Sequence, residues 1–450
     1  MFDSVLIANR GEIAWRIHRA CRALGLRTVA VYSEVDRDAP HVRAADQALC
    51  IGPAAASRSY LDPAAILFAA QLSGAGAIHP GYGFLSENAA FVQQVQDAGI
   101  AFVGPSAACI RTMGDKVAAK RAMRAAGVPC VPGPDERLPD DPAALREIAR
   151  AIGFPLIVKA AGGGGGRGMR VVHTEDELPA ALALTRAEAQ RAFANPEVYL
   201  EKFLTRPRHV EVQVLADAHG QALWLGSRDC SLQRRHQKVV EEAPAPGIAA
   251  EAIAAIGARC AAACRQIGYC GVGTFEFLYQ DGDFFFIEMN TRLQVEHPVT
   301  EMTSGIDIVQ QQLRVARGER LAFTQAEVAC NGHAFECRIN AEDAQSFRPS
   351  PGLITGWTLP EGEGVRVDSH AGAGCRVPPH YDSLVAKLVV HGASRAQALA
   401  RLRAALDAMR IDGIATNLAL HRRLLRDEGV AAGGVDIHHL ERWLRQPAAA

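Results

Sequence analysis

Several features that would assign a protein to a common class are missing from this chain of 450 residues. It has no apolar run of the roughly 18 residues that a membrane-spanning helix needs, and its start lacks a basic segment followed by an apolar one. Its 48 Lys+Arg face 49 Asp+Glu, which argues against nucleic acid or an anionic membrane as a partner. We therefore expect a cytoplasmic protein of two or three domains whose partners are small molecules and proteins.

Two kinds of cofactor site are also missing. The 11 cysteines include no Cys-x-x-Cys pair, which argues against a zinc site or a redox dithiol. Cys260 and Cys264 lie one helical turn apart in an Ala-rich stretch, where a packed helix face explains the spacing better than metal ligation. The Gly-x-Gly-x-x-Gly fingerprint is absent after the first predicted strand, which argues against a nicotinamide cofactor.

Lysine is scarce, since only six of the 48 cationic residues are lysine. In a chain that uses arginine by default, a lysine marks a position where a compact ammonium serves better than a planar guanidinium, as beside a phosphate. Four of the six fall in the motifs described below. The full set is Lys116, Lys120, Lys159, Lys202, Lys238 and Lys387.

The order of predicted elements indicates three domains, α/β and α+β, with a helical linker. A doubly wound parallel sheet is predicted over residues 1–105, with strands at 5–8, 28–32, 77–79 and 100–103. Helices fill the linker over 106–130, and a Pro-rich stretch then leads into a small lid domain over 131–203. A larger α+β domain is predicted over 204–446, with strands near 210–215, 274–278, 284–290 and 333–339 and a helix near 394–409.

Five consecutive glycines, residues 162–166, separate two strand patterns at 154–160 and 169–173. A phosphate-binding P-loop would instead join a strand to a helix and continue as Gly-Lys-Ser/Thr. A flexible linker is the plain alternative, but linkers are seldom flanked closely by two strands. We therefore predict a lid whose backbone N–H groups close over phosphates, with Lys159 beside it as a point charge.

The run from Glu288 to Glu296 alternates polar and apolar residues. In an extended chain its five polar side chains would share one face. A half-exposed strand has the same pattern, but this run follows Phe284–Ile287, which is apolar on both faces. Carboxylate and amide oxygens such as those of Glu288 and Asn290 suit Mg²⁺ or Mn²⁺ that bridges phosphates, so the run predicts a functional face.

Glu276 lies on the preceding predicted strand and completes this set. It opposes Glu288 directly only if an odd number of residues connects the strands, so we predict a three-residue bulged turn at 281–283. Two carboxylates and an amide would then converge on two metal ions, the arrangement that phosphoryl transfer uses to neutralise developing charge.

Two further stretches are ambiguous by themselves. Residues 198–204 end the lid domain, where backbone groups could bind an adenine edge, although a strand ending in Glu-Lys is common on protein surfaces. The basic run 233–238 is either a solvated patch or a source of ribose contacts and an anion site.

In combination and order, these stretches resemble the biotin carboxylase family of the ATP-grasp superfamily. The likeness extends from Ile7 to His438 and includes the segments 7–13, 79–88, 113–116, 162–168, 228–231, 233–239 and 288–301. It implies an ATP-grasp fold in which a Rossmann-like N-terminal domain precedes a mobile lid domain and a C-terminal α+β domain.

The resemblance also implies a role for each matching position. ATP would contact Lys116, Lys159, Gly165, Gly166, Glu201, Lys202, Phe203, Leu204, His209, Gln233 and His236. Two Mg²⁺ or Mn²⁺ ions would be bound by Glu276, Glu288 and Asn290. Bicarbonate would be held by Lys238, Arg292 and the Val295 backbone, Glu296 would remove its proton, and Arg338 would stabilise the biotin enolate.

Such an enzyme transfers the γ-phosphate of ATP to bicarbonate, and the resulting carboxyphosphate supplies CO₂ to biotin. Related multi-domain carboxylases carry a biotin-bearing Met-Lys-Met segment, which this sequence lacks. The resemblance therefore implies a separate biotin carboxyl carrier protein, carboxyltransferase subunits of an acetyl-CoA carboxylase in fatty acid synthesis, and a homodimer. One departure is Ser227, where the family usually has Glu, and it puts only local packing in doubt.

Two other classes of function compete with this one. Another ATP-grasp ligase would join a carboxylate to an amine through an acylphosphate, so its ATP hydrolysis would depend on an amino acid. A nucleotide-sensing regulator would keep the clamp without turnover, but it would not need Arg292, Glu296 and Arg338. The sequence does not indicate which acyl-CoA is served, and no spacing argument assigns a role to Cys230.

Overall fold

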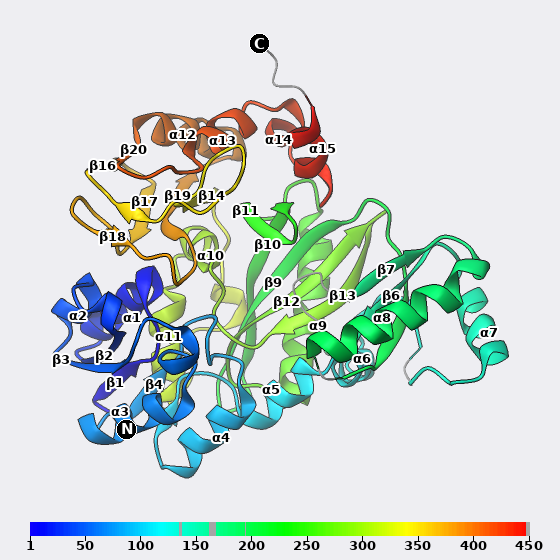
Figure 1. The fold of residues 1–450 in the computed structure, drawn as a ribbon, viewed down its shortest axis with the longest axis horizontal. Coiled ribbons are helices and arrows are strands. Elements are labelled where there is room, and N and C mark those ends of the chain that lie inside the picture. The colour runs from blue at the N-terminus through cyan, green and yellow to red at the C-terminus, as the bar shows by residue number, and fades with distance from the viewer. Residues whose placement is uncertain (135–136, 162–167, 194, 447–450) are drawn as a thin grey trace.

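The computed structural model describes residues 1–134, 137–161, 168–193 and 195–446. Its N-terminal part, blue in Figure 1, contains the predicted parallel sheet, in the order β3-β2-β1-β4-β5. The central strand is fully buried, as expected for a sheet covered by helices on both faces. The strands are β1 (Ser4–Ile7), β2 (Arg27–Ser33), β3 (Gln47–Gly52), β4 (Ala77–His79) and β5 (Ala101–Phe102), and the helices are α1 (Gly11–Ala23), α2 (Pro40–Ala44), α3 (Pro63–Ser73) and α4 (Ala89–Asp97).

Two helices lead from this sheet to a smaller three-stranded sheet. They are α5 (Ala107–Gly114) and α6 (Lys116–Ala125), and the side chain of Asp115 caps α6 by accepting from two backbone N–H groups. The small sheet has the order β7-β6-β8 and is antiparallel, as the predicted hairpin requires. Its elements are α7 (Pro142–Ile152), β6 (Leu156–Ala160), β7 (Met169–Val172), α8 (Leu178–Phe193) and β8 (Val198–Lys202), and the glycines at 162–166 lie outside the described residues.

An eight-stranded sheet fills the rest of the chain, in the order β13-β12-β9-β10-β11-β14-β19-β17. Its neighbouring strands are antiparallel, and helices cover it as in Figure 1. The strands are β9 (Arg208–Ala216), β10 (Ala222–Arg234), β11 (Gln237–Ala243), β12 (Gly271–Gln280), β13 (Asp283–Asn290), β14 (His333–Asn340), β17 (Val365–Ser369) and β19 (Leu384–Gly392). The helices are α9 (Ala250–Gln266), α10 (His297–Ser304), α11 (Ile308–Ala316), α12 (Arg395–Ala408), α13 (Leu418–Leu424), α14 (Glu428–Ala432) and α15 (His439–Arg445).

Two short strand pairs complete the C-terminal end: β15 (Gly352–Leu353) with β18 (Arg376–Val377), and β16 (Gly356–Thr358) with β20 (Arg410–Asp412). Cys260 and Cys264 are buried on α9, which confirms the packed helix face. Among the described residues, no helix combines the length and the apolar character needed to cross a membrane. The fold is thus the expected α/β ATP-grasp arrangement, while the domain boundaries given above stay predictions.

The turn between β12 and β13 differs from the prediction. Glu276 does lie opposite Glu288, but the turn has two residues, Asp281 and Gly282, with φ of 55° and 94°. A two-residue Asp-Gly turn of this kind matches the natural twist of a hairpin. The odd residue that sets the register is Ile287, which forms a β-bulge where the pairing shifts between Glu276 and its neighbour. The prediction of a three-residue turn was therefore wrong, although the pairing it was meant to explain is present.

Replacing Gly282 with alanine is expected to lower the free energy of unfolding by about 1 kcal/mol, because a side chain disfavours its left-handed backbone. A methyl group at this position would meet no described atom within 4 Å, so the loss comes from the backbone alone. Gly114→Ala is the matched control, since that glycine also has open space around it but ends helix α5. Urea unfolding should show a loss for the first variant and no loss for the second, and equal effects would contradict the explanation.

Candidate active site

A pocket of about 1190 Å³ lies between the N-terminal domain, the small sheet and the eight-stranded sheet. Its lining includes every predicted site residue that the structure describes, whereas Gly165 and Gly166 lie outside the described residues. These lining residues are Lys116, Lys159, Glu201, Lys202, Phe203, Leu204, His209, Gln233, His236, Lys238, Glu276, Glu288, Asn290, Arg292, Val295, Glu296 and Arg338. Segments from the whole length of the chain thus meet at one site.

The run from Glu288 to Glu296 reaches this pocket by a different path from the one predicted. Only its first part is extended, because β13 ends at Asn290 and the chain then leaves the sheet and enters α10 at His297. The backbone N–H of Thr291 donates to a carboxylate oxygen of Glu87 at 3.1 Å, so its acceptor is a side chain and not the backbone of a neighbouring strand. The prediction of one extended, alternating strand over residues 288–296 was therefore wrong. The polar side chains of the run nevertheless line one pocket.

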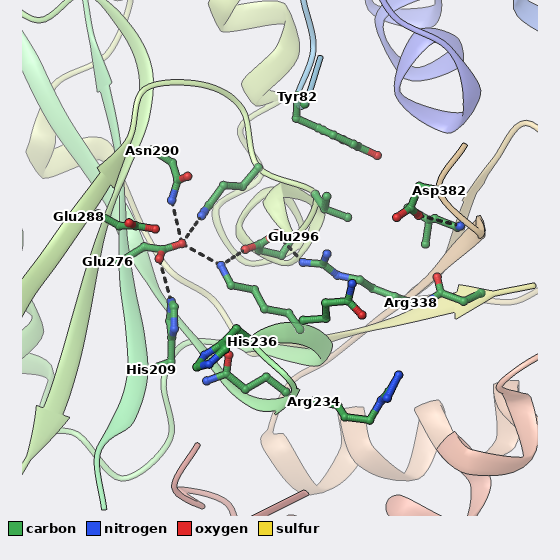
Figure 2. Close-up of a pocket in the computed structure, with 18 of the residues that line it drawn as sticks. Tyr82, His209, Arg234, His236, Glu276, Glu288, Asn290, Glu296, Arg338 and Asp382 are labelled. Carbon is green, nitrogen blue, oxygen red and sulfur yellow. Dashed lines mark hydrogen bonds and ion pairs between the residues drawn. The ribbon is translucent and has the colours of Figure 1, made fainter. Parts of the chain in front are cut away.

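At the end of β13 the hairpin places oxygen atoms together. Glu276 and Glu288 face each other across the hairpin, and the Asn290 amide nitrogen donates to Glu276 Oε1 at 2.8 Å (Figure 2). Gln294 also donates to Glu276 Oε1 at 2.8 Å. Burial raises the pKa of Glu276, but Lys238 and His209 outweigh it and lower that pKa to about 2, so the carboxyl group is ionised.

Lys238, on β11, is the cation at the centre of the pocket. Its Nζ lies 2.9 Å from Glu276 and 2.6 Å from Glu296, and it also contacts Glu211. Burial of the ammonium opposes its charge, but these carboxylates raise the pKa of Lys238 well above its ordinary value. The ammonium is therefore charged and held between three carboxylates.

Arg338, on β14, extends the charged network away from the hairpin. It donates to Glu241 at 2.6 Å. It also donates to Glu296 at 2.9 Å (Figure 2). Burial favours the neutral form of Glu296, yet Lys238 and Arg338 lower the pKa of that carboxyl group. Burial also raises the pKa of Glu241, to about 7, against the pull of Arg338. Glu296 is thus an ionised carboxylate between two cations, which is the state that a general base requires.

A second group of residues lines the part of the pocket next to the small sheet. Lys116 lies 3.1 Å from Glu288, and Lys159 lies 2.6 Å from the fully buried Glu201. The basic run 233–238 forms the tip of the β10–β11 hairpin, where Arg235 and His236 occupy the turn. Gln233 is buried and lines the pocket with His236, whereas Arg235, His236 and Gln237 at the tip are exposed, so the run contributes to the pocket and also faces solvent.

The oxygen atoms at the hairpin fit a hard divalent cation. Glu276, Glu288 and Asn290 offer carboxylate and amide oxygens, which Mg²⁺ and Mn²⁺ prefer, and two ammonium groups stand within 3.1 Å of the carboxylates as countercharges. A second possible set joins Glu276 to His209 and Glu211. His209 fits less well as a ligand because, although burial opposes its charge, the adjoining glutamates raise its pKa to about 9.

Several residues of this network were missed by sequence reasoning. Arg228 is fully buried and contacts Glu211, Gln213 and Gln294, so it organises the floor of the pocket. Glu211 and Gln213 alternate with the predicted His209 along β9, and this period of two was a signal that could have revealed them. Glu87, which holds Arg292 at 2.7 Å, has no such signal because its contact spans 205 positions of the chain.

Cys230 is buried beside Lys238 and Glu296. Burial raises the pKa of its thiol well above the ordinary value, so the group is neutral at physiological pH. A neutral thiol makes a poor base, and the structure favours a packing role for this cysteine.

His209 is expected to be protonated in the free protein at neutral pH. Its folded pKa of about 9 lies above the ordinary 6.5, so its pairing stabilises the fold fully below pH 6.5 and is lost as the pH rises through 9. The loss should be about 3 kcal/mol. Histidine NMR titration should place its midpoint near 9, and His209→Gln should remove the corresponding pH dependence of unfolding. The exposed His219→Gln is the control, and a His209 midpoint below 7 would contradict the expectation.

Three family models match the chain in succession. The model described as "Biotin carboxylase, N-terminal domain" matches residues 1–110. The model described as "Carbamoyl-phosphate synthase L chain, ATP binding domain" matches residues 115–324. The model described as "Biotin carboxylase C-terminal domain" matches residues 336–442.

Curated relatives match almost the whole chain. A protein named biotin carboxylase from Pseudomonas aeruginosa is 61% identical over 444 residues, which cover 99% of each chain. A subunit of pyruvate carboxylase from Methanothermobacter thermautotrophicus is 49% identical over 446 residues, 99% of this chain and 91% of that protein.

Solved structures agree with these relatives. The Campylobacter jejuni biotin carboxylase–β-γ-ATP complex has a TM-score of 0.94 and 46% identity, and the match covers 98% of this chain and 99% of that one. The biotin carboxylase domain dimer of Hydrogenobacter thermophilus 2-oxoglutarate carboxylase, solved with MgADP, ADP and bicarbonate, has a TM-score of 0.93 and 44% identity over 100% of each chain. Its ATP-grasp fold, its charged pocket and these matches show that this chain belongs to the biotin carboxylase family and is an ATP-dependent ligase that carboxylates biotin.

Proposed function

We propose that the chain uses MgATP and bicarbonate to carboxylate biotin on a carrier protein, as the first half-reaction of an acetyl-CoA carboxylase in fatty acid synthesis. The observation that carries the proposal is the buried chain of ion pairs from Glu276 through Lys238 and Glu296 to Arg338. Such a chain beside a nucleotide site is not needed for ATP binding alone. It provides cations for an anionic substrate and an ionised carboxylate to accept its proton.

ATP would occupy the part of the pocket next to the small sheet. Lys116 and Lys159 would meet its phosphates, since both ammonium groups line the pocket and now rest against carboxylates. Glu201 to Leu204 would contact the adenine, and His209, Gln233 and His236 the nucleoside. The ammonium of Lys202 donates to the carbonyls of Gly153 and Phe154, so this residue would act through its backbone. The nucleotides named for both neighbouring structures support this assignment.

Two divalent ions, Mg²⁺ or Mn²⁺, would be held by Glu276, Glu288 and Asn290. When bound, the ions neutralise charge on the phosphate being transferred. The chain's own contribution is to present three oxygen ligands from one rigid hairpin, with the register set by the bulge at Ile287. The second neighbour, named with magnesium and bicarbonate, supports magnesium.

Bicarbonate would lie against Lys238, Arg292 and the backbone of Val295. The Val295 N–H has no acceptor among the described residues, and Glu87 holds the Arg292 guanidinium beside the pocket. As a bicarbonate oxygen attacks the γ-phosphorus, the bond to the ADP oxygen breaks and Glu296 takes the bicarbonate proton. The products of this step are ADP and carboxyphosphate.

Carboxyphosphate would then break into CO₂ and phosphate, and the phosphate would remove the proton from the biotin ureido nitrogen. That nitrogen would attack CO₂ to form carboxybiotin. The negative charge that develops on the ureido oxygen would be met by Arg338, which is oriented by Glu241 and Glu296. Each residue thus acts on a separate charge, which makes the roles separable by mutation.

The decisive experiment measures phosphate release and carboxybiotin formation by the chain with MgATP, bicarbonate and free biotin, each omitted in turn. The proposal expects phosphate release only with bicarbonate and carboxybiotin only with all three. Addition of EDTA should abolish both products, and excess Mg²⁺ or Mn²⁺ should restore them. Phosphate release that required an amino acid would instead indicate a carboxylate–amine ligase, and tight ATP binding without turnover would indicate a regulator.

The second candidate function is carboxylation of a different final acceptor. One relative belongs to a pyruvate carboxylase and one neighbour to a 2-oxoglutarate carboxylase. The acetyl-CoA assignment rests on the resemblance given in the sequence analysis, since the relative with 61% identity is named without an acceptor. The two are separated by transfer of labelled carboxyl from the carrier to acetyl-CoA, pyruvate or 2-oxoglutarate in the presence of the matching carboxyltransferase subunits.

We also propose a homodimer, which the dimer named for the Hydrogenobacter thermophilus neighbour supports. Sedimentation of the purified chain would test this state. A cytoplasmic location stays a prediction.

A further inference from the structure

Two of the six lysines, Lys120 and Lys387, lie outside the sequence motifs, and both are buried. Lys120 contacts Glu201 in the proposed nucleotide site. Lys387, on β19, has no exposed side-chain surface. A buried ammonium is retained only where carboxylates and carbonyls surround it, so the partners of Lys387 indicate what it is for.

The partners of Lys387 come from two distant parts of the chain. Its Nζ lies 3.0 Å from Glu12 on helix α1, and it donates to the backbone carbonyl of Val295 at 3.0 Å. The hydroxyl of Tyr82 donates to the same oxygen of Glu12. Burial opposes the charge, but Glu12 and Glu336 outweigh it and raise the pKa of Lys387, so the ammonium is charged. Lys387 therefore ties the N-terminal domain to the loop that follows β13.

This loop needs an anchor because it has left the sheet. Residues 291–296 belong to no strand, and the backbone is held at one end by Glu87 and at the other by the His297 ring against the Gln294 carbonyl. The next carbonyl along the chain, that of Val295, is held by Lys387. The Val295 carbonyl shares one planar peptide group with the Glu296 N–H. Holding it restricts the torsion angles on either side of that group, and the positions of the Val295 N–H and the Glu296 side chain depend on these angles.

Lys387 is also linked to the opposite side of the site. It is the cross-strand partner of Arg338 in the β14–β19 pair, and cross-strand partners share one face of a sheet. Arg338, which would meet biotin, and Lys387, which holds the loop 291–296, are therefore positioned by the same pair of strands. An arginine would not serve at this point, because a single nitrogen must meet two oxygens in a closed space.

We propose that Lys387 is a positioning residue for bicarbonate: by holding the Val295 carbonyl, it directs the Val295 N–H and the Glu296 carboxylate toward that substrate. The inference rests on the proposed function, because it takes Val295 and Glu296 as bicarbonate contacts. It does not place Lys387 in contact with any substrate.

The test compares Lys387→Met with the matched variant Lys120→Met, since both remove one buried ammonium and leave a chain of similar length. Lys387→Met is expected to raise the KM for bicarbonate at least tenfold while the Kd for MgADP stays within twofold. Lys120→Met, which acts next to Glu201, is expected to raise the Kd for MgADP and leave the bicarbonate KM within twofold. Isothermal titration with MgADP and phosphate-release kinetics give the two values.

A purely structural role would not produce this split. An unchanged bicarbonate KM in a Lys387→Met protein that still binds MgADP would overturn the proposal, as would equal loss of both affinities. If the single variant does not fold, Glu12→Gln/Lys387→Met removes both charges of the pair, and its bicarbonate KM should rise by the same factor. Failure of both proteins to fold would show that Lys387 serves the fold and would also overturn the proposal.

Failure of this inference can be told apart from failure of the proposed function. If the unmodified chain releases phosphate without any dependence on bicarbonate, the proposed function is wrong. If that dependence is present and only the Lys387 variant behaves like the unmodified chain, the proposed function stands and the positioning role is wrong.

Discussion

Replacing Glu296 with glutamine is expected to slow bicarbonate-dependent phosphate release about a thousandfold, the scale of a lost general base. Glu296 is buried and ionised between Lys238 and Arg338, at 2.6 and 2.9 Å. Glutamine has the same shape and its amide oxygen can accept a hydrogen bond from Lys238, but it cannot take a proton from bicarbonate. The attack on ATP should therefore fail while the pocket keeps its form.

Two measurements separate loss of the base from loss of the fold. MgADP affinity of Glu296→Gln should stay within twofold of the unmodified chain, and its thermal unfolding should change little because both cations keep other carboxylate partners in Glu211 and Glu241. The surface variant Glu319→Gln removes a carboxylate whose ion pairs within the described part of the chain are with Arg314 and Arg317, and it should keep full activity. Phosphate release by Glu296→Gln within tenfold of the unmodified rate would remove this residue from the mechanism.

Replacing Arg338 with glutamine is expected to separate the two halves of the reaction. Carboxybiotin formation should fall at least a hundredfold, because no cation then meets the charge on the ureido oxygen. Bicarbonate-dependent phosphate release should fall less than tenfold, since Lys238 still pairs with Glu296. The variant should thus hydrolyse ATP in response to bicarbonate without storing the CO₂ on biotin.

The ratio of phosphate to carboxybiotin is the measurement for this second variant. A ratio at least tenfold higher than in the unmodified chain is the expected result, and unchanged carboxylation would remove Arg338 from the mechanism. Equal loss of both products would mean that Arg338 acts by orienting Glu296. Glutamine is preferred to alanine because it avoids a cavity beside Glu241, which is buried and depends on Arg338 as its partner.

Local patterns predicted much of the fold. The strands and helices that bound the parallel sheet follow from runs of apolar residues and from glycines, and β4 matches its predicted range at both ends. The pairing of Glu276 with Glu288 was also predicted, because cross-strand partners in a hairpin depend only on nearby residues. The turn itself was not, since a bulge at Ile287 and an odd turn produce the same register.

The site was predicted less evenly. Most of its residues were placed through a resemblance that covers the whole chain, and each described one lines the pocket. The path of residues 291–296 was not predicted, because alternation alone cannot show where a strand ends when a distant side chain such as Glu87 replaces its next hydrogen bond. Arg228 and Glu211 were missed for a related reason, because they contribute to the site through a contact between separate strands.

By itself the sequence determined the kinds of chemistry available, the order of the domains' elements and the family, because residue type and short-range spacing carry that information. Tertiary structure alone decided which charges meet. Lys387 shows this most clearly, since its two partners, Glu12 and Val295, are 375 and 92 positions away and no periodic pattern links them. Electrostatic pairing in a buried pocket depends on distance and on exclusion of water, and both exist only once the sheets have packed.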